Sequence, residues 1–141
     1  MDNDERRFQA LDFLFDYSKG TLWRVKDRVW KEVIPNFVVK RKEHPGLSIG
    51  RKRVSSIYDT IPMLIGTSKK SGKPDEIFFI KNFYNDPNKK DKLTYFNVLR
   101  PHSIRFNEFG VAKGVSVNTE NPRLTPEGVR QLNLFLGISE K

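Results

Sequence analysis

His44 lies in the segment K-R-K-E-H-P-G, directly before Pro45 and among several cations. Histidine takes up and releases protons near neutral pH, so it serves well as a general base or acid. Cations close to the ring in space would favour its neutral form. The segment therefore predicts proton transfer beside a bound phosphate, and the alternative is an exposed loop histidine without a chemical role.

Two further places carry side chains of chemical interest. Thr67 and Ser68 follow the apolar run IPMLIG, and hydroxyls at a strand end can donate to a phosphate oxygen. The alternative is a turn in which they cap their own backbone. His102, in R-P-H-S, has a weaker case, because a histidine at a strand end is often only a hydrogen-bonding residue.

The chain carries a large positive charge. Its 141 residues include 26 Lys and Arg against 17 Asp and Glu, a formal net charge of +9. This excess suits a polyanionic partner, most commonly nucleic acid, although a basic chain can also use its charge only for solubility. Tyr58, Tyr84 and Tyr95 are candidates for stacking on unpaired bases, with ordinary packing as the alternative. Four clusters in predicted loops hold much of the charge: Lys40, Arg41 and Lys42; Arg51, Lys52 and Arg53; Lys69, Lys70 and Lys73; and Lys89, Lys90 and Lys92.

Several function classes are excluded by composition. There is no Cys, which removes disulfide frameworks, Cys-based zinc sites and Cys nucleophiles. With two His, a His-rich metal site is not expected, and no nucleotide-binding glycine motif occurs. We therefore expect no metal and no cofactor. No apolar run reaches the roughly 18 residues of a membrane span, and the polar start is not a secretory signal, so a cytoplasmic protein without membrane contact is expected.

Helices are predicted at both ends of the chain. Acidic residues open an apolar periodicity over residues 2–20, which predicts a helix, and residues 21–30 are interpreted as a second one. At the other end, Thr125 is a good N-cap, Pro126 fits the first helical position and Gly137 ends the helix. Residues 110–123 between the last strand and this helix are expected to be loop.

Short apolar runs between these helices predict strands. We expect strands over residues 33–39, 46–50, 61–66, 76–83, 93–99 and 102–106, separated by polar loops with turn residues. Within residues 93–99, Thr94, Phe96 and Val98 alternate with Tyr95 and Asn97. This punctuation is typical of a small, strongly bent sheet or barrel. The expected class is a mainly β fold with flanking helices (α+β) in one domain, residues 1–141.

In this order, the pieces resemble the MazF/PemK-like toxins of type II toxin–antitoxin systems, over roughly three quarters of the chain. They are a charged loop leading into His44-Pro45-Gly46-Leu47, an apolar strand ending in Thr67-Ser68, a basic loop, a strand pair through Val98-Leu99-Arg100 to Ile104, and a helix opened by T-P-E. The resemblance implies a small SH3-like barrel of the CcdB/MazF type over residues 31–141, closed by the C-terminal helix. Residues 1–30, the helical extension, have no counterpart in the smallest members.

The resemblance also implies an activity and a site. The family comprises homodimeric, metal-independent endoribonucleases that cleave single-stranded RNA selectively and bind an acidic antitoxin. Its catalytic basic residue and its Thr or Ser fall on His44 and Thr67; many members have Arg where this chain has His44, and Arg41 is then the candidate for the missing cation. We expect RNA contacts from Lys40, Lys42, Ser68, Lys69, Lys70 and Lys73. Two alternatives remain open: a non-catalytic nucleic-acid-binding module of the SH3-like type, and a barrel used for protein contact.

Overall fold

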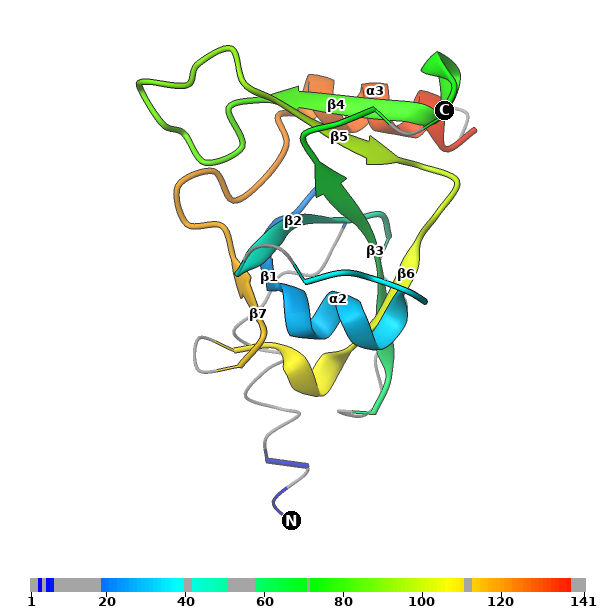
Figure 1. Ribbon diagram of the computed structural model, residues 1–141, viewed down its shortest axis with the longest axis vertical. Helices are drawn as coiled ribbons and strands as arrows, with labels where there is room; N and C mark the ends of the chain where they lie inside the picture. The colour runs from blue at the N-terminus through cyan, green and yellow to red at the C-terminus, as the bar shows by residue number, and fades with distance from the viewer. Residues whose placement is uncertain are drawn as a thin grey trace.

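The computed structural model describes residues 3, 5, 6, 19–39, 42–50, 58–70, 72–110 and 113–137. Most of the regular secondary structure in the described residues consists of short strands, with two helices placed apart on the molecule (Figure 1). The elements, in chain order, are β1 (Leu22–Lys26), α2 (Asp27–Val33), β2 (Glu43–Ser48), β3 (Thr60–Thr67), the 3-10 turn η1 (Pro74–Glu76), β4 (Ile77–Lys81), β5 (Leu93–Asn97), β6 (His102–Arg105), the 3-10 turn η2 (Phe106–Glu108), β7 (Val115–Val117) and α3 (Pro126–Phe135).

All strand pairs in this sheet are antiparallel. The order is β4-β5-β3-β2-β1-β7, and β6 pairs with β3 beside this path. Over the described residues the ladder does not return from β7 to β4, so the sheet is open. The expected mainly β, α+β class is confirmed in this form.

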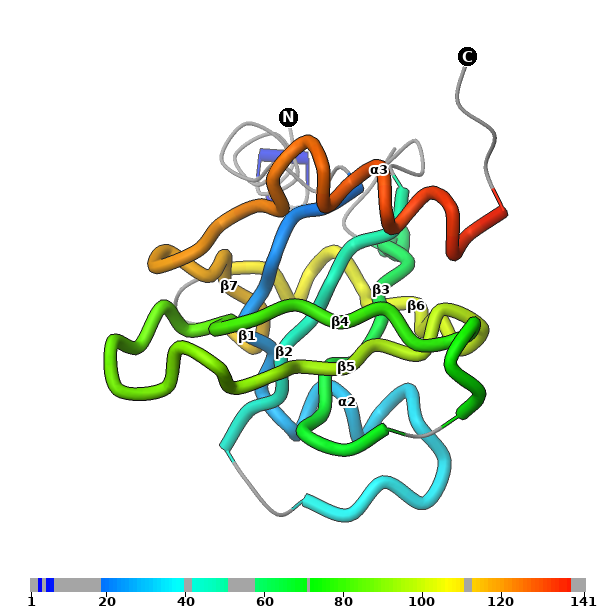
Figure 2. The backbone as a smooth tube through the Cα atoms, turned by 90° about the horizontal axis from the view of Figure 1, so that it is seen from above, coloured from blue at the N-terminus to red at the C-terminus, as the bar shows by residue number. Residues whose placement is uncertain are grey.

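β3 is the strand around which the sheet bends. Its first half pairs with β6, from Thr60↔Arg105 to Met63↔His102, and its last two residues pair with β5, at Gly66↔Phe96 and Thr67↔Tyr95. Between these two ladders, two residues of β3 (64 and 65) lie opposite five residues: Asn97, which ends β5, and the four residues of the β5–β6 connection. The extra residues form a turn that separates β5 from β6. This break allows β4 and β5 to leave the plane of β1, β2 and β6, as Figure 2 shows from above.

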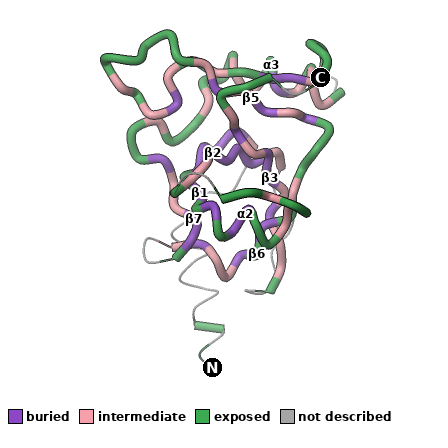
Figure 3. The backbone as a smooth tube through the Cα atoms, in the orientation of Figure 1, coloured by how far each residue is buried: buried purple, intermediate pink, exposed green. Residues whose placement is uncertain are grey.

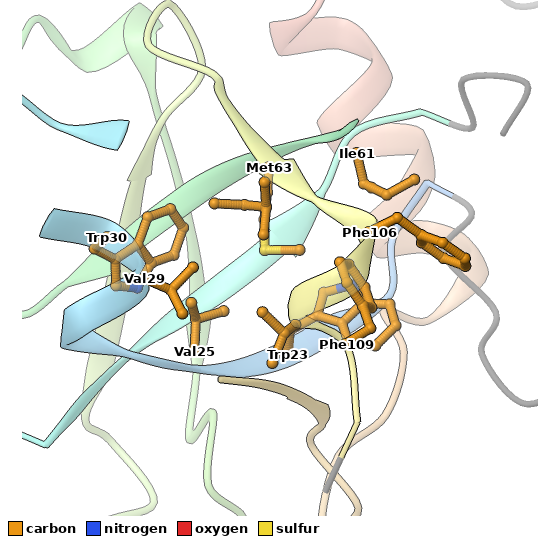
Figure 4. Close-up of a cluster of buried hydrophobic side chains, with 10 residues drawn as sticks. Trp23, Val25, Val29, Trp30, Ile61, Met63, Phe106 and Phe109 are labelled. Carbon is orange, nitrogen blue, oxygen red and sulfur yellow. The ribbon is translucent and has the colours of Figure 1, made fainter. Parts of the chain in front are cut away.

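Two clusters of buried apolar side chains pack against the bent sheet, and Figure 3 shows buried positions along β1, β2 and β3. On one face, α2 covers a cluster in which Trp23 packs edge-on against Phe109, at 4.9 Å between ring centroids, and Met63 lies between the sheet and the helix (Figure 4). On the other face, Leu132 of α3 joins Leu22, Leu47, Leu64, Phe78, Phe83, Phe96 and Val98. Full burial of a side chain of Leu or Phe size contributes about 1.5–3 kcal/mol of transfer free energy. Both Trp side chains are larger and fully buried, so burial of each one stabilises the fold by several kcal/mol.

Residues 21–39 differ from the expectation. The helix predicted over residues 21–30 begins only at Asp27; before it, Trp23 and Val25 are buried while Arg24 and Lys26 are exposed, the period of a strand. The strand predicted over residues 33–39 does not form, since Val33 ends α2 and Asn36 has a positive φ of 61°. β1, which falls within the predicted extension of residues 1–30, pairs with β2 and β7 and so belongs to the sheet.

The other predictions agree more closely with the structure. β3, β5 and β6 lie within one or two residues of their predicted ranges, and Thr94 and Phe96 are buried while Tyr95 and Asn97 are partly exposed. The Thr125 hydroxyl accepts a hydrogen bond from the Gly128 N–H at 3.0 Å and caps α3. Residues 110–123, expected as loop, include β7. The helix predicted over residues 2–20 lies mostly outside the described residues.

Candidate active site

The candidate site lies where β2 and β3 separate. The β2–β3 ladder ends at Gly46↔Ile65, after which β3 pairs with β5 instead. Gly66 is required there, because a Cβ on it would come within 2.8 Å of Pro45 Cβ and 2.9 Å of Phe96 Cε1. Continuing the register by two residues brings His44 opposite Thr67 on the same face of the sheet. Both residues line one small pocket of about 30 Å³.

His44 belongs to β2 and not to a loop, which is a correction to the sequence-based expectation. Its side chain is only 17% exposed. Nδ1 lies 2.6 Å from Oδ1 of Asp27, whose side chain is 2% exposed. The Trp30 indole N–H donates to the His44 carbonyl oxygen at 3.3 Å, and the Phe37 ring meets the imidazole edge-on with centroids 5.7 Å apart. The ring therefore has a defined position and orientation.

The hydrogen bond with Asp27 fixes which ring nitrogen of His44 carries a hydrogen. A carboxylate is an acceptor only, so Nδ1 carries the hydrogen of this bond. In the neutral ring, Nε2 then has a free lone pair, and no described residue forms a hydrogen bond with it. Such a histidine is poised to accept a proton at Nε2, with the carboxylate stabilising the imidazolium that forms.

Sequence patterns do not indicate Asp27 as part of this site. It is the first residue of α2, and its backbone N–H donates to the Lys42 carbonyl oxygen at 3.0 Å. This bond ties the start of α2 to the residue just before β2, and so brings the carboxylate to His44. In the sequence, Asp27 is one of 17 acidic residues and lies 17 positions from His44, so no local pattern indicates it.

Thr67 has a different environment from the one expected. Its hydroxyl donates to the Lys69 carbonyl oxygen at 2.7 Å, so the side chain caps its own turn, the alternative that the sequence left open. The hydroxyl hydrogen is therefore engaged, while the oxygen keeps lone pairs that can accept. A role for Thr67 as a donor to phosphate is not supported in this conformation.

The expected RNA-binding residues fall into two groups, those that are exposed on the surface and those that lie outside the described residues. Lys42, just before β2, and Ser68, Lys69, Lys70 and Lys73, after β3, are all exposed. The Lys70 ammonium lies 5.7 Å from the centroid of the Tyr95 ring, a cation–π distance. Lys40 and Arg41, together with the cluster at residues 51–53, lie outside the described residues.

A larger cationic pocket adjoins the pocket of His44 and Thr67. It has a volume of about 400 Å³ and shares Glu43, Tyr84, Lys92 and Thr94 with it. Glu43 accepts two hydrogen bonds from Arg24, at 2.8 and 2.9 Å, and one from the Tyr84 hydroxyl at 3.3 Å. Its charge is thus compensated. Three more cations line this pocket and form no ion pair with a described residue: Lys42, Lys89 and Lys92.

The β4–β5 connection carrying Lys89 and Lys92 is anchored to the fold. The Asn82 N–H donates to the Lys92 carbonyl oxygen at 2.8 Å, and the buried Asn118 amide donates to the Phe83 carbonyl oxygen at 2.7 Å. Asn82 and Asn85 adopt positive φ angles of 53° and 52°, which asparagine tolerates better than most residues. The connection, which projects from the sheet in Figure 1, therefore presents its lysines from a defined base.

Comparison with models of known families, with curated proteins and with solved structures finds no match for this chain. In the described part of the chain, no helix is long and apolar enough to cross a membrane. The same residues contain no group of three or more His, Cys, Asp or Glu side chains placed to hold a metal ion.

Proposed function

We propose that this protein is an endoribonuclease that cleaves single-stranded RNA by attack of the 2′-hydroxyl, in the manner of the MazF/PemK-like toxins. The observation that carries the proposal is the hydrogen bond between His44 Nδ1 and the buried Asp27 carboxylate, which leaves Nε2 to exchange a proton at the gap between β2 and β3. The cations beside this gap supply the attraction for a phosphate backbone.

In this proposal, Nε2 of His44 takes the proton of the 2′-hydroxyl. The 2′-oxygen then forms a bond to phosphorus and the bond from phosphorus to the 5′-oxygen breaks, which gives a 2′,3′-cyclic phosphate and a 5′-hydroxyl. Lys92, which lines the same pocket, stabilises the negative charge of the pentavalent intermediate. In an in-line displacement the leaving oxygen lies opposite the attacking one, so its proton comes from a group other than His44. DNA lacks the nucleophile and is not a substrate.

The architecture and partners belong to the same proposal. The break between β5 and β6 along β3 supports the bent sheet of a small SH3-like barrel. The net charge of +9 suits both RNA and an acidic antitoxin. We extend the proposal to the homodimer of that family and to its metal-independent, sequence-selective cleavage.

A cleavage assay tests the proposal. A long single-stranded RNA is incubated with the protein in excess EDTA, beside the His44→Ala variant and a Lys113→Ala control, which changes an exposed lysine that lines none of the pockets described above. We expect discrete fragments ending in a cyclic phosphate from the wild type and the control, and none from His44→Ala. Intact RNA in every lane, with the protein folded by circular dichroism, would contradict it.

A second candidate function is favoured by Thr67. Because its hydroxyl donates to its own turn, the residue serves the fold and is not free to donate to a phosphate. A non-catalytic, SH3-like nucleic-acid-binding module needs no hydroxyl that is free to donate at this position. The same gel distinguishes the two: RNA that is shifted but uncut, with a shift that weakens as salt rises, supports the binding module.

A further inference from the structure

A third pocket adjoins the candidate active site and shares no lining residue with the cationic pocket. It has a volume of about 260 Å³, and Thr67 lines both it and the pocket of His44. Phe37 forms part of its wall and also touches the His44 ring. A ligand seated in it would therefore lie next to the atoms that we propose to be reactive.

The lining of this pocket suits a flat heterocycle. Tyr95, Phe37 and His102 supply aromatic surfaces, Ile34, Ile65 and Ile77 supply apolar ones, and Lys69 and Arg100 supply positive charge. Pockets for drug-sized ligands have volumes of about 300 Å³ or more, so this one suits a smaller ligand, such as a single base. Aromatic side chains beside cations are how proteins hold unpaired bases and their flanking phosphates.

His102 is a residue of this pocket whose ring nitrogens have unused hydrogen-bonding capacity. Its ring is partly buried and edge-on to Trp30 with centroids 6.1 Å apart, and the imidazole forms no hydrogen bond with a described residue. Burial, and to a smaller degree the positive charge of Arg100, hold the pKa of His102 below its usual value. The neutral ring offers one donor and one acceptor. Asn97 has less to offer, since its Oδ1 already accepts from the Leu99 N–H at 2.9 Å.

We propose that this pocket binds one unpaired base of the RNA substrate, adjacent to the scissile phosphate, and that His102 reads the edge of that base. The proposal rests on the function proposed above and adds to it a source of sequence preference. The base lies against the aromatic wall, and its flanking phosphates lie near Lys69 and Arg100. An apolar peptide is the less suitable occupant, because its side chains supply no negative charge to match Lys69 and Arg100 in the lining.

The test uses His102→Phe, which keeps an aromatic ring against Trp30 and removes both ring nitrogens. Cleavage of a randomised RNA pool is sequenced for the wild type, for this variant and for Leu134→Ala, a control at an exposed residue of α3 outside the pocket. We expect the wild type to prefer one base at a fixed distance from the cut. In His102→Phe this preference falls about tenfold, the usual effect of losing a specific base contact, while the total cleavage rate at saturating RNA changes little. A preference that is unchanged in His102→Phe, or lost equally in Leu134→Ala, overturns the proposal.

A binding experiment separates this inference from the proposed function. A short oligonucleotide with 2′-deoxyribose at the cut cannot be cleaved, so its affinity reports binding alone. If the wild type cleaves no RNA but His102→Phe still loses its preference among four such oligonucleotides, the base pocket stands and the catalytic proposal fails. If cleavage is found and the four oligonucleotides bind both proteins alike, the pocket proposal fails alone. No perturbation of the His102 ring signals in NMR spectra by any oligonucleotide also overturns it.

Discussion

Replacing Asp27 by asparagine tests how the buried carboxylate acts on His44. Asparagine has nearly the same shape, but its amide nitrogen can donate to Nδ1 and so favours the tautomer with hydrogen on Nε2. That tautomer cannot accept the proton of a 2′-hydroxyl. The change should therefore lower the rate of RNA cleavage while leaving RNA binding nearly intact.

The size of the effect follows from the bond that is lost. Nδ1 of His44 and Oδ1 of Asp27 are 2.6 Å apart, and the carboxylate is almost fully buried. Hydrogen bonds to charged groups contribute about 1.5–3 kcal/mol. At about 1.4 kcal/mol for each factor of ten, we expect the single-turnover rate to fall by about 10- to 150-fold. His44→Ala should cost more, about 10²- to 10⁴-fold, the usual contribution of a general acid or base.

The assay is single-turnover cleavage of a labelled RNA oligonucleotide, with the melting temperature of each variant measured beside it. The double variant of Asp27 and His44 should be no slower than His44→Ala, because Asp27 acts through the histidine. Asp75→Asn, at an exposed carboxylate on η1, is the matched control. A folded Asp27→Asn protein with the wild-type rate, or a double variant whose losses multiply, would refute the reasoning.

Three further outcomes are expected. Gly66→Ala should lower the free energy of unfolding by about 1–3 kcal/mol through overpacking, since its Cβ would lie 2.7 Å from Thr94 Cγ2. Thermal melts measure this effect. Gly50→Ala is the control and should change the melt little, because no atom lies within 4 Å of its Cβ. Because the pKa of His102 is lowered in the folded state, the unfolded chain binds the proton more readily. This contribution to the free energy of unfolding is fully present above the ordinary imidazole pKa of about 6.5 and is lost as pH falls through it. Urea unfolding of His102→Phe should therefore show a weaker loss of stability at low pH than the wild type, and an equal loss would count against His102 as the cause. Lys92→Ala should weaken RNA binding and reduce the steepness of log affinity against log salt concentration by about 0.7, as for one lost phosphate contact to a single strand. Fluorescence titration at several salt concentrations measures this slope, and an unchanged slope would show that Lys92 makes no phosphate contact.

Local sequence patterns predicted those elements whose pattern and packing agree. The alternation in β5 has one face buried and one face partly exposed, and the cap at Thr125 needs only its own helix. In both, the forces that form the element act between residues close in the chain or follow directly from the period of apolar side chains. Such elements can be recognised without knowing what packs against them.

Residues 21–39 could not be predicted in the same way. Leu22, Val25, Val29 and Trp30 have spacings that also fit a helix, and only pairing with β2 and β7 makes the first part a strand. Pairing between strands depends on residues about 20 and 90 positions away along the chain. Tertiary structure therefore overrides the local pattern here.

By itself, the sequence determined the basic charge, the absence of cysteine chemistry, the order of most strands and the pairing of His44 with Thr67 as candidate residues. Only the tertiary structure decided what these residues can do. It placed Asp27 against His44, engaged the Thr67 hydroxyl in its own turn, and brought His102 into a pocket beside them. The physical reason is that the Asp27–His44 contact joins side chains far apart in sequence, and the bending of β3 between β6 and β5 brings Thr67, Tyr95 and His102 to one pocket. The Thr67 hydroxyl bonds a carbonyl only two residues away, in a turn whose conformation the local pattern left open.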